Sequence, residues 1–132
     1  MLHGPTIYVK IGFDERFRAD TNGQPDLPTN LLPALVDTGA YESCIDSALA
    51  MTLDLPIVDR QSVAGISGLD EVNVHLAQIH IPDLNVNLLG PFVGVHLTAG
   101  GQPHYALIGR TFLRHFEMRY HGQSGAVVMR SE

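Results

Sequence analysis

Glycine and proline, spread along the whole chain, divide this sequence of 132 residues into short segments. The chain contains 13 glycines and 8 prolines, and both residue types are disfavoured inside long helices. The segments between them are rich in valine, isoleucine and threonine, which favour strands. The sequence therefore predicts a mostly β fold. Its length fits a single domain covering residues 1–132.

Alternating hydrophobic residues predict the first strand over residues 6–13, where Ile7, Val9 and Ile11 share one face. A polar, turn-rich segment, residues 14–30, follows it and is expected to be a long surface loop. Further strands are expected at residues 31–36, on both sides of 64–68, and at 91–97, 104–109, 116–120 and 125–130.

Two features modify this pattern. In the strand that follows residue 68, the hydrophobic residues change parity near Ala77, which indicates a bulge or a change of buried face. Two short helices interrupt the strands, one over residues 46–56 and one over residues 111–115. Asp46 is placed to cap the first of these helices and Pro56 to end it.

The charge and the single cysteine limit the possible partners and compartments. The formal net charge is −6, from 14 acidic and 8 basic residues, which argues against nucleic acid as a partner. Cys44 cannot form an internal disulfide, so it fits a reducing compartment and is expected to be a small buried core residue. The chain has neither a signal-peptide pattern nor a long apolar stretch. We therefore expect a cytoplasmic protein without membrane contact.

Three short motifs stand out by their order and spacing: LVDTGA at 35–40, AGISG at 64–68 and LIGRTFL at 107–113. In the first motif, an apolar strand runs directly into the carboxylate of Asp37. Burying a carboxylate is unfavourable unless other groups compensate it. Asp37 is therefore either a solvated acid in an ordinary turn or a group placed for chemistry. AGISG alone is equally consistent with an ordinary hairpin turn.

Taken together, the three motifs resemble those of the retropepsin-like aspartic proteases, the retroviral-type, single-domain family. The resemblance spans about residues 7–128. It implies a single-lobe acid-protease fold with a flap hairpin, active as a two-fold homodimer in which Asp37 faces its symmetry mate. Terminal strands around Ile7 and Val127 are then the expected interface. The implied substrate is an extended polypeptide, and neither a metal nor another cofactor is implied.

The resemblance also implies a role for each matched residue. Two adjacent aspartates share one proton, so that one can act as a general base on water while the other acts as an acid. The implied catalytic residues are Asp37, Thr38 and Gly39. Substrate contacts are expected from Ala40, Gly65, Ile66, Ser67, Gly68 and Ile108. Structural support for the site is expected from Leu107, Gly109 and Arg110.

The sequence departs from the retroviral pattern directly after LVDTGA. Acids commonly occupy the next two positions in that pattern, and the first of them pairs with the arginine that follows the later glycine. Tyr41 and Glu42 stand at these positions here, so Arg110 pairs either with Glu42 or with another group. This departure and the long 14–30 loop favour a cellular, bacterial-type member. The alternatives are a proteolytically inactive binding or dimerisation module of the same fold, and an unrelated β domain with a chance Asp-Thr-Gly.

Seven histidines raise the question of a metal site, but their spacing does not favour one. His75 and His80 are five residues apart, which places them on opposite faces of a strand. His115 and His121 have neither acidic nor thiol residues beside them. No metal is therefore expected.

Overall fold

The computed structural model describes residues 5–18, 23–65 and 68–131. Its strands are β1 (Thr6–Gly12), β2 (Leu32–Val36), β3 (Cys44–Asp46), β4 (Ile57–Gly65), β5 (Gly68–Ile81), β6 (Val86–Val95), β7 (Ala106–Ile108), β8 (Phe116–His121) and β9 (Ala126–Ser131). Its helices are α1 (Ser47–Thr52), α2 (Arg110–Leu113) and the short 3-10 helix η1 (Pro82–Leu84). The expectation of a mostly β fold with two short α-helices is confirmed.

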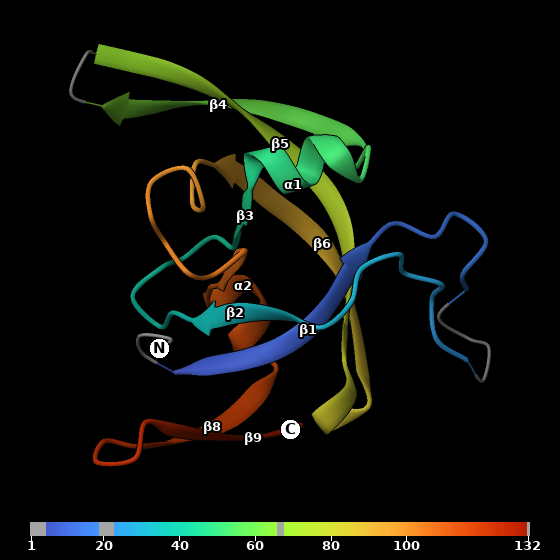
Figure 1. The fold of residues 1–132 in the computed structure, drawn as a ribbon, viewed down its shortest axis with the longest axis vertical. Helices are drawn as coiled ribbons and strands as arrows, with labels where there is room; N and C mark the ends of the chain where they lie inside the picture. Colours follow the sequence, from blue (N-terminus) through green and yellow to red (C-terminus); the bar gives the residue numbers. More distant parts are fainter. Residues whose placement is uncertain (1–4, 19–22, 66–67, 132) are drawn as a thin grey trace.

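Seven strands form one sheet in the order β1-β2-β7-β3-β6-β5-β4, and β1 also pairs with β5. This additional pairing closes six of the strands into a barrel, which β4 does not join because it pairs only along β5 (Figure 1). The strands β8 and β9 form a separate antiparallel pair. The β4–β5 hairpin projects beyond the barrel, at the top of Figure 1.

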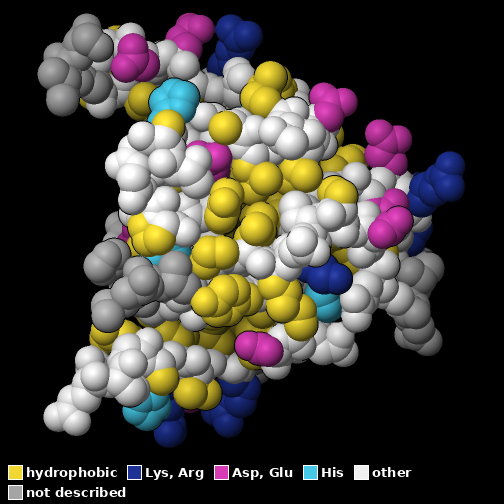
Figure 2. All heavy atoms as spheres, viewed as in Figure 1, with side chains coloured by type: hydrophobic (Ala, Val, Ile, Leu, Met, Phe, Trp, Pro, Cys, Tyr) yellow, Lys and Arg dark blue, Asp and Glu magenta, His cyan; other side chains and the backbone are white. Residues whose placement is uncertain are grey.

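The barrel encloses the hydrophobic core, to which nearly every element contributes. Phe92 of β6 stacks on Phe112 of α2, with ring centroids 5.1 Å apart. Other core residues include Val9, Ile11, Val36, Ile45, Ile79, Ile108 and Leu113. Hydrophobic side chains reach the surface between α1 and the β1–β2 pair (Figure 2).

The long strand β5 explains the change of parity seen in the sequence. Its first residues are exposed in the projecting hairpin, whereas nearly all residues from Val74 to Ile81 are buried on both faces. The pairing of β5 with β6 runs without a break over these same residues. Of the two explanations that the sequence offers, a bulge near Ala77 is therefore wrong, and a change of burial along β5 accounts for the pattern. The register irregularity lies in β4 instead, between Ile57 and Asp59.

Helix α1 begins where the sequence indicates but ends early. The Asp46 carboxylate accepts a hydrogen bond from the Leu49 N–H, as expected of an N-cap. The helix then stops at Thr52, four residues before Pro56. The strand expected at 91–97 begins earlier, at Val86, and β3 and η1 were not expected. The described parts of the 14–30 segment contain neither helix nor strand. Among the described residues, no helix is long and apolar enough to cross a membrane.

Candidate functional site

Asp37 lies directly after β2, at the edge of the sheet where β2 and β7 end side by side. The two strands are parallel, with Val36 opposite Ile108, so their carboxyl ends meet. The Asp37 N–H donates to the Ile108 carbonyl oxygen at 2.9 Å, which fixes the start of the loop. The side chain is half-buried, and its Oδ1 accepts the Gly39 N–H at 3.0 Å. Within the described part of the chain, the Asp37 carboxylate has no ion pair.

The segment after β7 crosses the loop that follows Asp37 and binds its backbone. The Arg110 N–H donates to the Ala40 carbonyl oxygen at 2.9 Å, and the Thr111 N–H donates to the Tyr41 carbonyl oxygen at 3.0 Å. The buried Ser43 hydroxyl accepts the Gly109 N–H at 2.9 Å. Three hydrogen bonds therefore hold residues 109–111 against residues 40–43.

Gly109 is the point of closest approach in this crossing. A Cβ atom at Gly109 would lie 2.6 Å from the Glu42 carbonyl oxygen and 2.9 Å from the Ala40 carbonyl oxygen. Both atoms belong to backbone that is itself hydrogen-bonded nearby, so neither can move away cheaply. The sequence expectation that Gly109 supports the site structurally has this steric basis.

Arg110 completes the link between the two loops. Its Nη1 donates to the Thr38 carbonyl oxygen at 2.8 Å, and its guanidinium carbon lies 5.8 Å from the centre of the Tyr41 ring. Glu42 instead accepts a hydrogen bond from Gln61 Nε2 at 3.1 Å. The partners of Arg110 are therefore a carbonyl group and an aromatic ring, where the retroviral pattern has a carboxylate.

Two sequence expectations at this site are wrong. Ile108 is only 1% exposed and belongs to the core, so its side chain does not reach a substrate. Successive residues of a strand face opposite sides, and the half-buried Leu107 is the residue of β7 that faces away from Ile108. Cys44 is half-buried in β3 rather than part of the core. Burial, and then the nearby carboxylates of Glu42 and Asp37, raise the pKa of the Cys44 thiol.

The two strands of the expected hairpin are present. Strands β4 and β5 pair from Asp59↔Val74 to Gly65↔Gly68. Gly68 has a φ of +116°, a conformation that favours glycine. Ile66 and Ser67 lie outside the described residues. In Figure 1 the hairpin and the carboxyl end of β2 both extend toward the left of the view.

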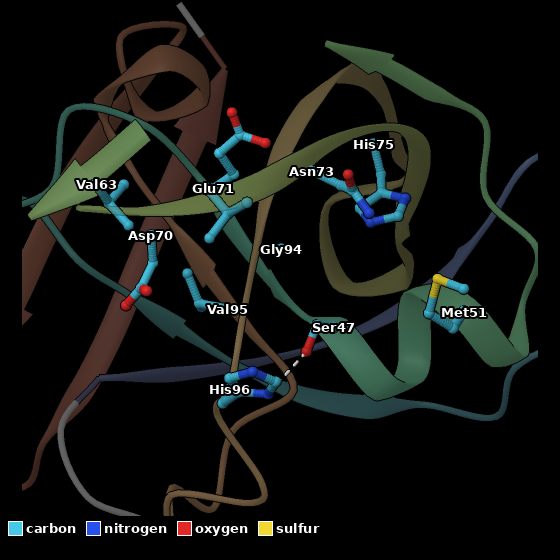
Figure 3. Close-up of a pocket in the computed structure, with 11 residues that line it drawn as sticks. Ser47, Met51, Val63, Asp70, Glu71, Asn73, His75, Gly94, Val95 and His96 are labelled. Atoms are coloured by element: carbon cyan, nitrogen blue, oxygen red, sulfur yellow. Dashed lines mark hydrogen bonds between the residues drawn. The ribbon is translucent and has the colours of Figure 1, made fainter. Parts of the chain in front are cut away.

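Several cavities border these elements, and the two larger ones differ in position. One, of about 470 Å³, is lined by Asp37 and Thr38 and by Met118, Tyr120 and Val127 of the β8–β9 pair. The second, of about 620 Å³, lies between the β4–β5 hairpin, α1 and the end of β6 (Figure 3). Its walls include Asp70 and His96, which sequence reasoning missed because their roles depend on contacts between distant segments.

The buried histidines have polar partners of their own. His80 Nδ1 lies 2.8 Å from Asn87 Oδ1, and His75 Nδ1 lies 3.4 Å from the Leu55 carbonyl oxygen. His104 contacts both Thr6 Oγ1 and Gln102 Oε1. Over residues 5–18, 23–65 and 68–131, no group of three histidine, cysteine or acidic side chains could hold a metal ion.

Comparisons with known proteins give likenesses to solved structures but no match at the level of sequence. No family model matches the chain, and no curated protein sequence matches it. Among solved structures, the chain is similar to EIAV protease complexed with the inhibitor HBY-793. The sequence identity is 18% and the TM-score is 0.48, over 85% of this chain and 86% of that one. A likeness at this level does not establish membership in a family.

Proposed function

We propose that this chain is an aspartic endopeptidase of the retropepsin type, whose active site forms when two copies pair and their Asp37 carboxylates face each other. One observation carries the proposal: the half-buried Asp37 carboxylate is held where the parallel strands β2 and β7 end, and among the described residues it accepts one hydrogen bond, from the Gly39 N–H. It is therefore fixed in position and keeps acceptor capacity for a water molecule or a second carboxyl group.

The chemistry follows from two such carboxylates. Like charges a few ångströms apart cannot both ionise easily, so the pair holds one proton and titrates as a unit. The ionised Asp37 takes a proton from a water molecule, and the resulting hydroxide attacks the carbonyl carbon of the peptide bond. The protonated Asp37 donates a hydrogen bond to the carbonyl oxygen and gives its proton to the amine nitrogen as the carbon–nitrogen bond breaks. The other Asp37 keeps the proton taken from water, so the pair again holds one proton. Water is the only co-reactant.

The remaining site residues have supporting roles in this proposal. Thr38 and Gly39 shape the loop that carries the acid, and Ala40 lies next to the substrate backbone. The β4–β5 hairpin, including Gly65 to Gly68, closes over an extended peptide and excludes water. Leu107, Gly109 and Arg110 hold the loop in place.

The second copy is required because one chain supplies one Asp37. A closed two-fold pair brings the same residue of each copy to the shared axis. The β8–β9 pair borders the cavity beside Asp37 and carries the exposed hydrophobic residues Tyr120 and Val128. We therefore place the interface on the terminal strands, with β1 and β9 contributing.

A proteolytically inactive dimerisation module is the second candidate. Tyr41 favours it, because the acid of the retroviral pattern is replaced there by a ring that packs on Arg110. This replacement and the long segment between β1 and β2 also fit a cellular rather than a viral member.

A cleavage assay on an unfolded protein substrate between roughly pH 3 and pH 7 separates the two candidates. Wild type and Asp37→Asn would be compared, and the mass of each in solution recorded. Cleavage by a dimeric wild type that disappears in a folded, dimeric Asp37→Asn is the expected result. A folded wild-type dimer that cleaves nothing over this range would favour the inactive module.

A further inference from the structure

We propose that the cavity beneath the β4–β5 hairpin binds a lysine or arginine side chain of the substrate, and that Asp70 selects it. The inference rests on the proposed function, since it names a side chain of the polypeptide substrate proposed above. The cavity measures about 620 Å³, and its described lining contains two carboxylates but neither lysine nor arginine.

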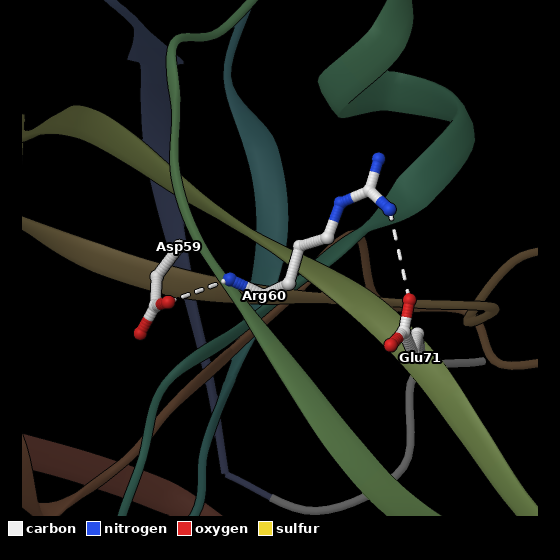
Figure 4. Close-up of polar contacts among 3 residues, drawn as sticks. All are labelled: Asp59, Arg60 and Glu71. Atoms are coloured by element: carbon white, nitrogen blue, oxygen red, sulfur yellow. Dashed lines mark hydrogen bonds and ion pairs between the residues drawn. The ribbon is translucent and has the colours of Figure 1, made fainter.

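The two carboxylates differ in how far they are already neutralised. Glu71 also lines the cavity, but it forms an ion pair with Arg60 at 3.6 Å (Figure 4). Asp70 forms no ion pair or hydrogen bond within the described part of the chain. The side chains of Asp70 and Glu71 point in opposite directions (Figure 3), as expected of successive residues in a strand. Asp70, on the exposed part of β5, is therefore the lining carboxylate that no cationic side chain of the described residues neutralises.

Two valine side chains lie beside Asp70 in this mixed lining, and they match the stem of a long basic side chain. Val63 is the cross-strand partner of Asp70, so the two side chains share a face of the hairpin. Val95 of β6 also lies at the Asp70 end of the cavity (Figure 3). Lysine and arginine pack their methylene groups on apolar surface while the charged end reaches a polar group. An acidic substrate side chain would instead meet the negative charge of Asp70.

The two histidines that line the cavity have partners elsewhere. His96 Nδ1 lies 3.1 Å from Ser47 Oγ, so that edge of the imidazole ring is directed toward α1. His75 is buried against the Leu55 carbonyl oxygen. The carboxylate that remains for a cationic ligand is that of Asp70.

Peptide binding to the Asp37→Asn variant tests the inference without depending on catalysis. One lysine is moved stepwise along a neutral, extended peptide, and a matching set carries norleucine, which keeps most of the stem but lacks the charge. At pH 7 and low salt, one lysine position is expected to bind about fivefold more tightly than its norleucine counterpart. Adding Asp70→Asn should remove this difference, and Asp70→Lys should favour a glutamate peptide at the same position.

The control is Asp83→Asn, which removes the same charge from exposed η1 at a distance from the cavity. It should keep the lysine preference. Equal binding of the two peptide sets, a preference that survives Asp70→Asn, or no peptide binding would each overturn the inference. Cleavage of the same peptides by wild type is measured separately. Cleavage without a lysine preference would refute only the specificity, whereas selective binding without cleavage would refute only the proposed function.

Discussion

Arg110 donates a hydrogen bond from Nη1 to the carbonyl oxygen of Thr38 at 2.8 Å. This bond joins the segment after β7 to the loop that carries Asp37. Because the acceptor is a backbone carbonyl and the other neighbour of Arg110 is the Tyr41 ring, neither contact depends on a titrating carboxylate. The loop is therefore held in the same way at neutral pH and at the acidic pH that favours a shared-proton aspartate pair.

Replacing Tyr41 tests whether the contact between its ring and Arg110 stabilises the loop that carries Asp37. Tyr41→Phe keeps the ring and should leave the free energy of unfolding nearly unchanged, whereas Tyr41→Ala should lower it by about 0.5–1 kcal/mol. Tyr41→Asp would give Arg110 a carboxylate partner whose pKa is lowered in the folded state. Its stabilisation should be present at pH 7 and be lost as the pH falls below about 4. Urea unfolding of the three variants at both pH values measures this, and equal stability of Ala and Phe variants would contradict it.

Gly109→Ala should be strongly destabilising, because the added Cβ would lie 2.6 Å from the Glu42 carbonyl oxygen. We expect a loss of about 1–3 kcal/mol in the free energy of unfolding. The matched control is Gly122→Ala, since a Cβ there meets nothing within 4 Å. Urea unfolding curves of both variants give the comparison. Similar stability of the two would show that the crossing is looser than the structure indicates.

The buried carboxylate of Asp46 makes the stability of the fold depend on pH. Burial alone would raise the pKa of Asp46, but hydrogen bonds from the N–H groups of Thr98, Leu49 and Leu97 and from the Thr98 hydroxyl lower it overall. A carboxylate whose folded pKa is lowered stabilises the fold above its unfolded pKa. This contribution is lost as the pH falls below about 4.

Asp46→Asn should reveal that contribution, because an amide offers one oxygen acceptor where the carboxylate uses both, at 3.0 to 3.2 Å. The free energy of unfolding at pH 7 should fall by about 1–2 kcal/mol. The difference between variant and wild type should shrink as the pH falls below about 4. Chemical denaturation across pH 3 to 7 measures both quantities, and a constant difference at every pH would contradict the assignment.

The thiol of Cys44 should not take part in catalysis. Burial and the carboxylates of Glu42 and Asp37 raise its pKa, so it is a neutral thiol at pH 7 and a poor nucleophile. Cys44→Ala should keep the rate of peptide cleavage, and iodoacetamide at pH 7 should react slowly with the folded protein. Loss of cleavage in a folded Cys44→Ala would indicate thiol chemistry instead.

Local patterns predicted much of this fold because many elements depend on local signals. The alternation of Ile7, Val9 and Ile11 marked β1, and the Asp46 cap marked the start of α1. The three-residue strand β3 has no such signal, because its pairing with β6 and β7 is set by tertiary contacts. The early start of β6 depends on the turn at Asn85, which adopts a left-handed conformation.

The candidate site could be predicted only in part for the same reason. The motif residues indicated that the Asp37 loop and the Gly109-Arg110 segment would meet, and their backbone hydrogen bonds do join them. Leu107 and Ile108 are adjacent and both apolar, so the sequence could not show which of the two faces outward. The proximity of Asp70 and Val95 is likewise nonlocal, since β5 and β6 bring them to the same cavity.

A mixing experiment tests most directly the central claim that two copies share one site. Wild type at a fixed concentration is mixed with increasing Asp37→Asn, and the rate of peptide cleavage is followed. If chains pair at random, a fourfold excess of the variant should reduce the rate to about one fifth, because only pairs of two wild-type chains remain active. Adding active Asp83→Asn instead should raise the rate. A rate that is unaffected by Asp37→Asn would contradict the shared site.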